Sequence, residues 1–275
     1  MVENSLTRKG IFVIGKESLA KNNWVYYVEF KGVRAVCKIY MNKYFLEQQN
    51  YEKRVLNDLK PLGFKLPELL AEGEINGNKY SILSEVDGRN LLNGVPCEYE
   101  WDVANFLEKL HQVNIPLPTH PLQKDLEVVV EKALNRMGID SIKRKYNELV
   151  FYTGNVGFCH RDPNFKHIFF NKNGLSGVVD FEDSMMLPIE TDYVSFIKDQ
   201  IETRRPTKEI LNFIKHYSGD KNNLCPYLIR LYVLDLGFGH GVEFRSKQAI
   251  IESLDLLFLD TDFEEKINRI KNDNS

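Results

Sequence analysis

The sequence predicts an α+β protein with two lobes, a small β-rich lobe at the N-terminus and a larger helical lobe after it. Three observations support this prediction. The chain has 275 residues, which is long enough to bury two cores. Short runs rich in aromatic and β-branched residues fill the first third. From residue 87 onward, apolar residues recur mainly at helical spacing. We therefore expect a first lobe over residues 1–86 and a second over residues 87–275.

The first lobe is predicted to hold strands and one helix. Aromatic and β-branched runs predict two strands joined by a two-residue turn at Lys31-Gly32. A helical pattern follows and is ended by Pro61 and Gly63. Two more strand-like runs flank the turn sequence Asn76-Gly77-Asn78. The expected strands are Ile11–Gly15, Trp24–Phe30, Val33–Tyr40, Glu68–Ile75 and Lys79–Val86, and the expected helix is Tyr44–Leu59.

The second lobe is predicted to be mostly helical. Residues 156–183 interrupt the helices with short strands and turns, and the polar tail after Asp262 is expected to fray. The expected helices are Asp102–His111, Leu122–Met137, Ser141–Tyr152, Thr207–Tyr217, Pro226–Leu236 and Gln248–Leu259. A sheet-rich half followed by a helical half favours a ligand cleft between lobes.

Charge and cysteine content narrow the functional classes. The net charge of −3 gives no electrostatic case for nucleic acid. Residues 1–88 carry 13 Lys and Arg against 11 Asp and Glu, and the remainder carries 23 against 28. The acidic second part hints at a cationic substrate, although solubility is the simpler explanation. The four cysteines form no C-x-x-C pair, and no apolar run is long enough for a membrane span, so we expect a cytoplasmic protein.

The segment from Gly157 to Asp192 carries the chemistry. Two short apolar strands, Ile168–Phe170 and Leu175–Val179, flank a turn. Such a hairpin brings the residues before it close to the residues after it, so we expect Asp162 and Asp180 to converge. Two neighbouring carboxylates repel each other unless a cation or proton lies between them. Because Mg²⁺ prefers carboxylate and phosphate oxygens, a metal–nucleotide site is the natural interpretation.

These residues resemble a known family. His160-Arg161-Asp162 followed by Asp180-Phe181-Glu182 is similar to the catalytic loop and metal-binding segment of protein-kinase-like enzymes. The closer resemblance is to the aminoglycoside phosphotransferase and choline kinase superfamily. Leu110-His111 at a helix end and Glu85-Val86 at the interlobe hinge fit that group. The order of segments matches over nearly the whole chain.

The resemblance implies a bilobal protein-kinase-like fold and a role for each matching residue. Asp162 would accept or orient the proton of the attacking hydroxyl, and Asp180 would hold Mg²⁺ against the phosphates of ATP or GTP. His160 would brace the loop. Glu85 and Val86, at the hinge, would contact the nucleotide. The implied activity is ATP-dependent transfer of a phosphate to a small hydroxylated molecule.

Lys38 and Glu52 are paired by an independent argument. Glu52 lies on the apolar stripe of the predicted helix, with Val55, Leu56 and Leu59. A carboxylate that faces a core needs a partner, and Lys38 in the preceding strand is the obvious candidate. Glu47 is the competing acid of the same helix, but its neighbours suggest a more solvated face. In kinase-like enzymes such a pair holds the lysine against the α- and β-phosphates.

Two features depart from the family pattern. His167 stands where a second metal-binding asparagine is usual. Three interpretations stay open: His167 binds a metal, with Mn²⁺ accepting imidazole better than Mg²⁺ does; it supports the loop; or the protein is inactive. Some antibiotic kinases and lipopolysaccharide-core sugar kinases tolerate histidine here. The hairpin after Ile14 also has one glycine in place of a G-x-G-x-x-G run. Lys16 or Ser18 is a candidate phosphate contact, although an exposed polar hairpin tip is the simpler interpretation.

The leading functional hypothesis is an O-phosphotransferase for an aminoglycoside-like or amino-alcohol substrate. Six acids are candidate partners for its ammonium groups: Glu182, Asp183, Glu190, Asp199, Glu202 and Asp235. Asp192 is expected to brace the loop. The alternatives are a sugar or lipopolysaccharide-core kinase and a pseudokinase that binds nucleotide without turnover. The sequence leaves the oligomeric state open.

Overall fold

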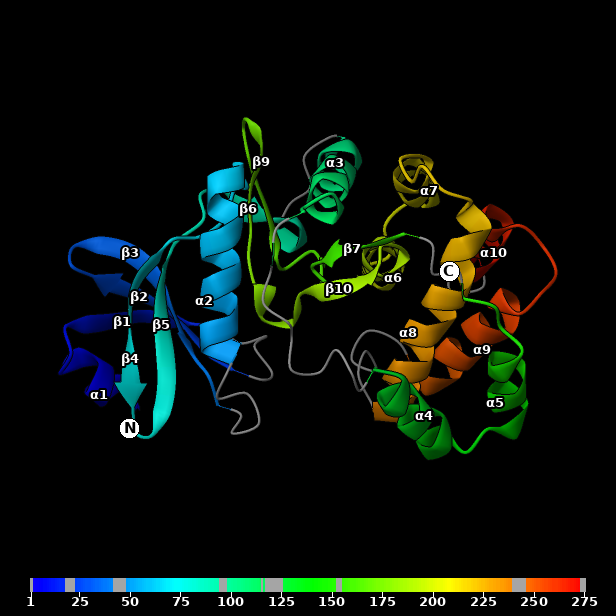
Figure 1. Cartoon of the computed structure of the whole chain (residues 1–275), viewed down its shortest axis with the longest axis horizontal. Helices are drawn as coiled ribbons and strands as arrows, with labels where there is room; N and C mark the ends of the chain where they lie inside the picture. Colours follow the sequence, from blue (N-terminus) through cyan, green and yellow to red (C-terminus); the bar gives the residue numbers. More distant parts are fainter. Residues whose placement is uncertain are drawn as a thin grey trace. The chain divides into compact units, whose positions relative to one another are not determined.

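Five antiparallel strands form the main sheet of the N-terminal part of the chain (Figure 1). Their order is β1-β2-β3-β5-β4. Lys31 and Gly32, between β2 and β3, have φ values of 52° and 79°, as the predicted two-residue turn requires. Asn76 and Gly77 form the same kind of turn between β4 and β5. The strands are β1 (Ile11–Lys16), β2 (Trp24–Phe30), β3 (Val33–Ile39), β4 (Leu69–Ile75) and β5 (Asn78–Ser84).

Two helices cover opposite faces of this sheet. Helix α1 (Val2–Thr7) buries Leu6 in a cluster with Ile11, Val28 and Cys37. Helix α2 (Gln48–Leu59), followed by the 3-10 turn η2 (Lys60–Leu62), lies on the face that carries Lys38. Helix α2 agrees with the predicted helix over its described length, whereas α1 is too short to show a periodic pattern.

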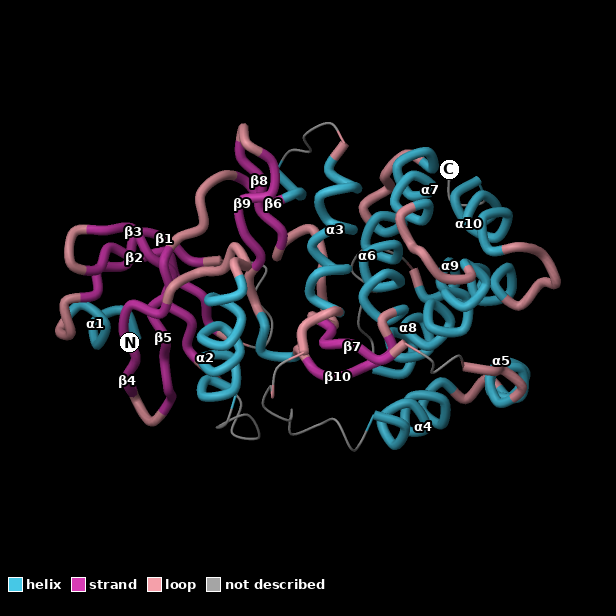
Figure 2. The backbone as a smooth tube through the Cα atoms, turned by 45° about the horizontal axis from the view of Figure 1, so that its top comes forward, coloured by secondary structure: helices cyan, strands magenta, loops and turns pink. Residues whose placement is uncertain are grey.

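The predicted hairpin before Asp180 is confirmed. Strands β8 (Ile168–Asn171) and β9 (Gly174–Val178) pair antiparallel, and β6 (Arg89–Asn90) adds a third strand before the 3-10 turn η3 (Leu91–Asn93) (Figure 2). The chain at residues 86–88 packs against this hairpin. The Ser176 hydroxyl donates to the Asp87 carbonyl, and the Asn171 amide donates to the Asp87 carboxylate at 2.8 Å.

Helices dominate the rest of the chain, apart from a two-stranded sheet of β7 (Val156–Cys159) and β10 (Met185–Pro188). Helix α6 is absent from the predicted elements because buried polar residues, among them Glu190 and Gln200, interrupt its apolar pattern. The helices are α3 (Tyr99–His111), α4 (Leu126–Met137), α5 (Asp140–Asn147), α6 (Glu190–Glu202), α7 (Thr207–Lys215), α8 (Leu224–Phe238), α9 (Lys247–Leu257) and α10 (Phe263–Asn272), with 3-10 turns η5 (Phe181–Asp183) and η6 (Lys221–Asn223).

Helix α10 corrects the expectation that the tail after Asp262 frays. Phe263, Ile267 and Ile270 are at most 1% exposed. Their spacing of four and three residues forms one apolar face of a helix. The residues between these three are mostly charged or polar, so the tail as a whole is too polar in composition to indicate a packed helix.

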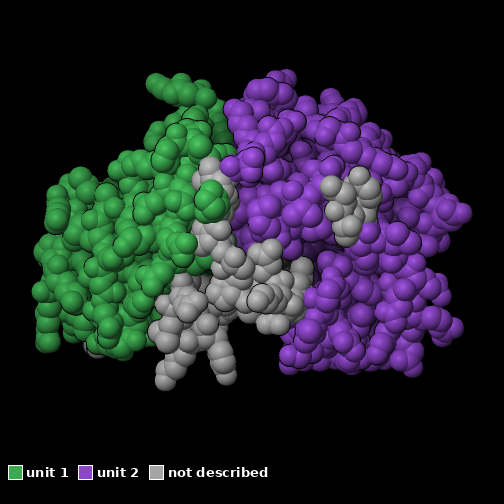
Figure 3. Space-filling view, in the orientation of Figure 1, with its two compact units in different colours: residues 1–94, 115–118, 166–182 green, residues 95–114, 119–165, 183–275 purple. Residues whose placement is uncertain are grey.

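The structure is a computed structural model that describes residues 2–17, 23–41, 48–93, 98–114, 116, 126–151, 155–238 and 246–272. The chain divides into two compact units (Figure 3). Unit 1 comprises Met1–Gly94, Ile115–Pro118 and Lys166–Glu182, and unit 2 comprises Val95–Asn114, Thr119–Phe165 and Asp183–Ser275. The predicted α+β class, with a sheet-rich N-terminal part and a helical C-terminal part, is confirmed. Among the described helices, none combines the length and the apolar character that crossing a bilayer requires.

Candidate active site

The predicted Lys38–Glu52 pair is present in unit 1. Lys38 lies in β3, and Glu52 lies on the buried face of α2. The Lys38 Nζ is 3.0 Å from Glu52 Oε2, and both side chains are buried. Two further donors hold Glu52: the Tyr40 hydroxyl at 2.8 Å and the Phe181 backbone N–H at 3.2 Å. The competing candidate, Glu47, lies outside the described residues.

Lys38 has two more carboxylate partners that the sequence reasoning did not assign to it. Glu182 Oε2 is 2.7 Å from Lys38 Nζ, and the Asp180 carboxylate also contacts the ammonium group. Both acids follow β9, so the hairpin delivers them to the lysine. Asp180 has a φ of 71°, in the left-handed region that non-glycine residues seldom adopt. Such strain persists only where surrounding contacts hold it, and it occurs often at functional sites.

The electrostatics of this cluster follow from burial and charge. Burial disfavours the ammonium form of Lys38, but Asp180, Glu182 and Glu52 outweigh it and raise the pKa of Lys38 well above its usual range. Burial raises the pKa of Glu182 to about 7, with Lys38 opposing and Asp180 and Glu52 adding to the shift. Three acids around one lysine leave an excess of negative charge.

This excess fits a divalent cation. Ligand atoms of Glu52, Asp180 and Glu182 all lie within 4.8 Å of one another. The His167 Nε2 is 3.3 Å from Asp180 Oδ2, whereas Lys38 contacts the other carboxylate oxygen, Oδ1. The Val179 N–H donates to the His167 carbonyl at 2.9 Å, which fixes the backbone between the two residues. Carboxylate oxygens with one imidazole nitrogen suit Mg²⁺ or, better, Mn²⁺.

The sheet face that carries Lys38 also carries apolar side chains. Residues paired across neighbouring strands point to the same face. By this register Phe12, Val36 and Leu83 share the face of Lys38. The Phe12 side chain is 53% exposed. The alternation of β3 around Lys38 could have identified Val36 from the sequence, since it lies two positions before the lysine.

Glu85 and Val86, the residues predicted to form the hinge, follow β5 directly. The Glu85 carboxylate forms a two-pronged ion pair with the Arg34 guanidinium, with distances of 2.9 and 3.0 Å. A Cβ at Gly177 would lie 2.6 Å from a Val86 methyl group, so Val86 packs directly against β9. The Glu85 side chain is therefore engaged by a protein partner, and contact of these residues with a nucleotide stays a prediction.

The candidate phosphate contact at Lys16 is wrong for the described geometry. Lys16 pairs with Tyr26, on the sheet face opposite to Lys38. Its ammonium group lies 5.6 Å from the ring centres of Trp24 and Tyr26, a cation–π arrangement. Ser18, the other candidate, lies outside the described residues.

The loop that carries Asp162 is in unit 2, where Asp192 braces it as expected. Asp192 accepts the His160 N–H at 2.9 Å and the Arg161 N–H at 2.6 Å. Arg161 has a φ of 74°, so the brace holds a strained turn immediately before Asp162. His160 is fully buried and accepts the Asp162 N–H at 3.3 Å, which agrees with its predicted supporting role.

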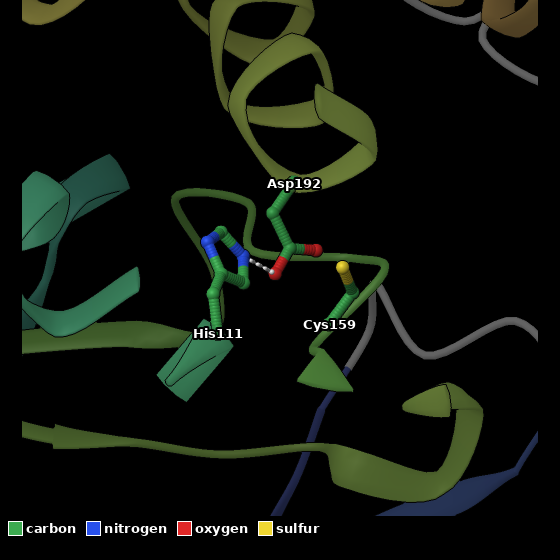
Figure 4. A group of neighbouring side chains, drawn as sticks. All are labelled: His111, Cys159 and Asp192. Carbon is green, nitrogen blue, oxygen red and sulfur yellow. Dashed lines mark hydrogen bonds and ion pairs between the residues drawn. The ribbon is translucent and has the colours of Figure 1, made fainter. Parts of the chain in front are cut away.

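His111 and Cys159 complete this brace (Figure 4). His111 Nε2 lies 2.9 Å from Asp192 Oδ2. The ligand atoms of the three residues lie within 4.8 Å of one another, a spacing that a metal ion could use. However, Asp192 already accepts backbone donors with both oxygens, and burial raises the pKa of the Cys159 thiol well above its usual range. The group therefore acts as a structural support.

A second carboxylate holds the other end of the loop. Asp199 of α6 accepts the Phe165 N–H at 2.7 Å. Burial raises the pKa of Asp199 to about 6; the Phe165 hydrogen bond opposes the shift, and the charges of Asp162 and Glu202 add to it. The loop backbone is thus anchored on both sides of Asp162. Asp192 holds the backbone at residues 160 and 161, and Asp199 holds it at Phe165.

Most acids predicted to bind ammonium groups have partners within the protein. Glu182 binds Lys38 in unit 1, and the buried Glu190 accepts the Tyr217 hydroxyl at 2.6 Å. Lys198 lies 2.9 Å from Glu202 and 2.8 Å from Asp235. Asp183 lies 3.8 Å from Arg161. Their pairing corrects the view that these carboxylates stand ready for a substrate.

The residues with predicted roles divide between the units. Lys38, Glu52, His167 and Asp180 belong to unit 1, and Asp162 belongs to unit 2. The expected convergence of Asp162 and Asp180 is a relation between units and stays a prediction.

The comparisons with known proteins concern family and fold. The model of the phosphotransferase enzyme family matches residues 18–227. A structure of spectinomycin phosphotransferase with ADP and spectinomycin aligns with a TM-score of 0.62 at 15% identity, over 98% of this chain and 96% of that one. For an aminoglycoside 3′-phosphotransferase of type VIII the TM-score is 0.65 at 15% identity, over 86% and 99%. For macrolide 2′-phosphotransferase from Brachybacterium faecium it is 0.58 at 14%, over 94% and 98%. No curated protein sequence matches this chain.

Proposed function

Because this chain belongs to the phosphotransferase enzyme family, we propose that it transfers the γ-phosphate of ATP to a hydroxyl group of a small cationic molecule. The proposal depends on one observation. The buried Lys38 of β3 is paired with Glu52 of α2 and also contacts Asp180, which follows the β8–β9 hairpin. A buried charge cluster of this kind contributes little net stability, which favours a functional role.

In this proposal Lys38 binds the α- and β-phosphates, and the apolar side chains on its sheet face pack against the purine. Glu85 and Val86 contact the base edge through their backbone. Asp180 and His167 hold the divalent cation, which neutralises phosphate charge when it is bound. Mn²⁺ is expected to serve at least as well as Mg²⁺, because His167 supplies a nitrogen ligand.

Asp162 supplies the group that orients the substrate hydroxyl and takes its proton as the bond to the γ-phosphorus forms. The bond from that phosphorus to the bridging oxygen of ADP breaks in the same transfer. Phosphoryl transfer asks the protein mainly for positioning and charge neutralisation. The double bracing of the loop by Asp192 and Asp199 supports this assignment, since a positioned acid needs a fixed backbone.

A cationic substrate is supported by the charge of the chain outside the first 88 residues, which carries 28 acids against 23 basic residues. The test is a panel of aminoglycosides, amino alcohols and neutral sugars, with ADP formation as the readout and ATP compared with GTP. We expect an amine-bearing alcohol to give the highest kcat/KM and ATP to be the preferred donor.

The matched control is Asp162→Asn, which keeps the size of the side chain. Turnover of a neutral sugar alone would favour the sugar-kinase alternative. Nucleotide binding with equal background ATP consumption in wild type and Asp162→Asn would favour a pseudokinase and contradict the proposal.

A further inference from the structure

Asn23, which immediately precedes β2, makes a buried contact that links distant parts of unit 1. Its Nδ2 donates to both carboxylate oxygens of Glu182, at 2.7 and 3.0 Å. Its Oδ1 accepts the Met41 backbone N–H at 3.4 Å. Asn23 and Glu182 are each 6% exposed. Both ends of the amide therefore have partners, and these partners fix its orientation.

Glu182 links Asn23 to Lys38, because it binds both side chains. The Glu182 oxygen that receives the shorter Asn23 hydrogen bond, Oε2, is also the one that lies 2.7 Å from Lys38 Nζ. The ammonium group is held independently by Glu52, at 3.0 Å, from helix α2. Lys38 thus has two buried anionic partners on two separate elements, in addition to the partly exposed Asp180.

The two buried partners have different supports. Tyr40 and the Phe181 backbone hold Glu52, and Asn23 holds Glu182. A buried carboxylate without donors is costly, and hydrogen bonds to its charged form offset that cost. Asn23 supplies two such bonds from a side chain that cannot itself carry charge. It therefore holds the Glu182 carboxylate where that group contacts the lysine.

We propose that Asn23 and Glu182 form a second tether for Lys38, in which Asn23 is a positioning residue that acts through Glu182. This inference rests on the proposed nucleotide-binding role of Lys38. Asn23 and Glu182 together hold the Lys38 ammonium group in the orientation that binds the phosphates. Glu52 holds the same ammonium group separately. Loss of one tether leaves the other in place, whereas loss of both lets the lysine move.

The test measures the affinity of the full chain for a fluorescent ADP analogue over a range of Mg²⁺ concentrations, with kcat and KM for ATP on the accepted alcohol. Asn23→Leu and Glu182→Gln are each expected to weaken nucleotide binding about three- to tenfold. The change should appear in KM with kcat altered less than about twofold, because the lysine is misplaced and the base is not. Asn23→Ser replaces Asn23→Leu if the latter does not fold.

Gln49→Leu is the matched control. Gln49 is a buried amide in the same unit that donates to the Tyr80 carbonyl and the Ser81 hydroxyl, and not to the carboxylates that hold Lys38. Its loss is expected to lower Tm but to leave nucleotide affinity within about twofold of wild type. Asn23→Leu combined with Glu182→Gln should equal the single variants, whereas Asn23→Leu combined with Glu52→Gln should exceed either one.

Three results would contradict either the proposed function or the tether. If wild type binds no nucleotide, the proposed function fails. If wild type binds but Asn23→Leu binds equally well, or no more weakly than Gln49→Leu, the tether fails and the proposed function stands. If additional Mg²⁺ restores the affinity of Glu182→Gln, Glu182 serves as a metal ligand, and the tether is likewise wrong.

Discussion

Lys38 lies at the centre of the charged cluster in unit 1. Its ammonium group is buried and lies among the carboxylates of Glu52, Asp180 and Glu182. Desolvating these charges costs several kcal/mol per ion, which their mutual attraction repays only in good geometry. In the proposed function, a divalent metal beside the nucleotide would balance the excess of acids over bases in this cluster.

Replacement of Lys38 by methionine should affect binding and stability together. The variant leaves three acids without their ammonium partner, so we expect the free energy of unfolding at pH 8 to fall by about 3–5 kcal/mol. The Kd for ATP should rise at least about tenfold. Urea unfolding at pH 8 and pH 5 checks the first part, and the loss should be smaller at pH 5 as the acids become protonated.

Lys38→Arg is the control for charge. It should retain most of the stability but lose part of the nucleotide affinity, because a guanidinium places its donors differently. A folded Lys38→Met protein that binds ATP as tightly as wild type would contradict the role assigned to this lysine.

Asp199 predicts a specific dependence of stability on pH. Burial raises its pKa to about 6 in the folded protein, against about 3.9 in an unfolded chain. A raised pKa means that Asp199 contributes stability below pH 4, and that this contribution is lost as the pH rises through 6. Asparagine does not titrate, so the stability of Asp199→Asn relative to wild type should rise by about 2–3 kcal/mol between pH 4 and pH 7.

Chemical unfolding of both proteins across this range is the measurement. In an Asp162→Asn background the rise should be smaller, because the Asp162 charge is one cause of the shift. A relative stability that stays constant from pH 4 to pH 7 would rule out a raised Asp199 pKa.

Among the elements, the β8–β9 hairpin and the hinge form one packed assembly within unit 1. Gly88 has a φ of 104°, and a Cβ there would lie 2.1 Å from the Phe170 carbonyl oxygen. A Cβ at Gly177 would lie 2.6 Å from a Val86 methyl group. The hairpin that carries His167 and Asp180 is therefore positioned by the segment that is proposed to contact the base.

Gly88→Ala should destabilise unit 1 by more than about 3 kcal/mol, because both the backbone angle and the steric contact oppose a side chain. Gly77→Ala is the matched comparison, since its φ of 79° is also positive but no atom lies within 4 Å of the added carbon. We expect it to cost about 1 kcal/mol. Thermal unfolding of both variants measures the two losses of stability. Equal losses would exclude the steric contact at Gly88 as a cause of destabilisation.

Helix α10 offers a test of the corrected tail. Ile267 is fully buried, so Ile267→Ala should lower the free energy of unfolding by about 2–4 kcal/mol. Arg269 lies on the exposed side of the same helix, and Arg269→Ala should change it by less than about 0.5 kcal/mol. If Ile267→Ala had no more effect than Arg269→Ala, the tail would not belong to the folded core.

Elements with strong local signals could be predicted from the sequence. Turn chemistry at Lys31-Gly32 and Asn76-Gly77 set the strands around them, because only certain residues tolerate positive φ. Helix α1 and helix α6 could not be predicted, since the first is short and the second buries polar residues whose partners lie far away in sequence. Their stability comes from tertiary contacts that no local pattern records.

The same distinction applies to the site. The pairing of Lys38 with Glu52 follows from one acid on an apolar helical stripe, and it is confirmed. The roles of Asn23 and Glu182 could not be predicted, because the contact between them spans 159 positions. The acids assigned to a substrate were misjudged for the same reason: local sequence does not show that Tyr217 or Lys198 already binds them.

Across the whole chain, the residues proposed for nucleotide binding and the proposed base belong to different compact units. Unit 1 holds Lys38, His167 and Asp180, and unit 2 holds Asp162 on a loop braced from both ends. In the proposed function the first unit binds the phosphate donor and the second activates the acceptor.

The most direct test follows the phosphorus atom by ³¹P NMR with ATP, Mg²⁺ and the accepted alcohol. Wild type should convert the γ-phosphate signal into a phosphate monoester in equal amount with ADP. Asp162→Asn should slow this conversion about 100-fold or more, with the KM for ATP changed less than about threefold. Release of the phosphate only to water, or an equal rate of ester formation in Asp162→Asn, would contradict the central claim.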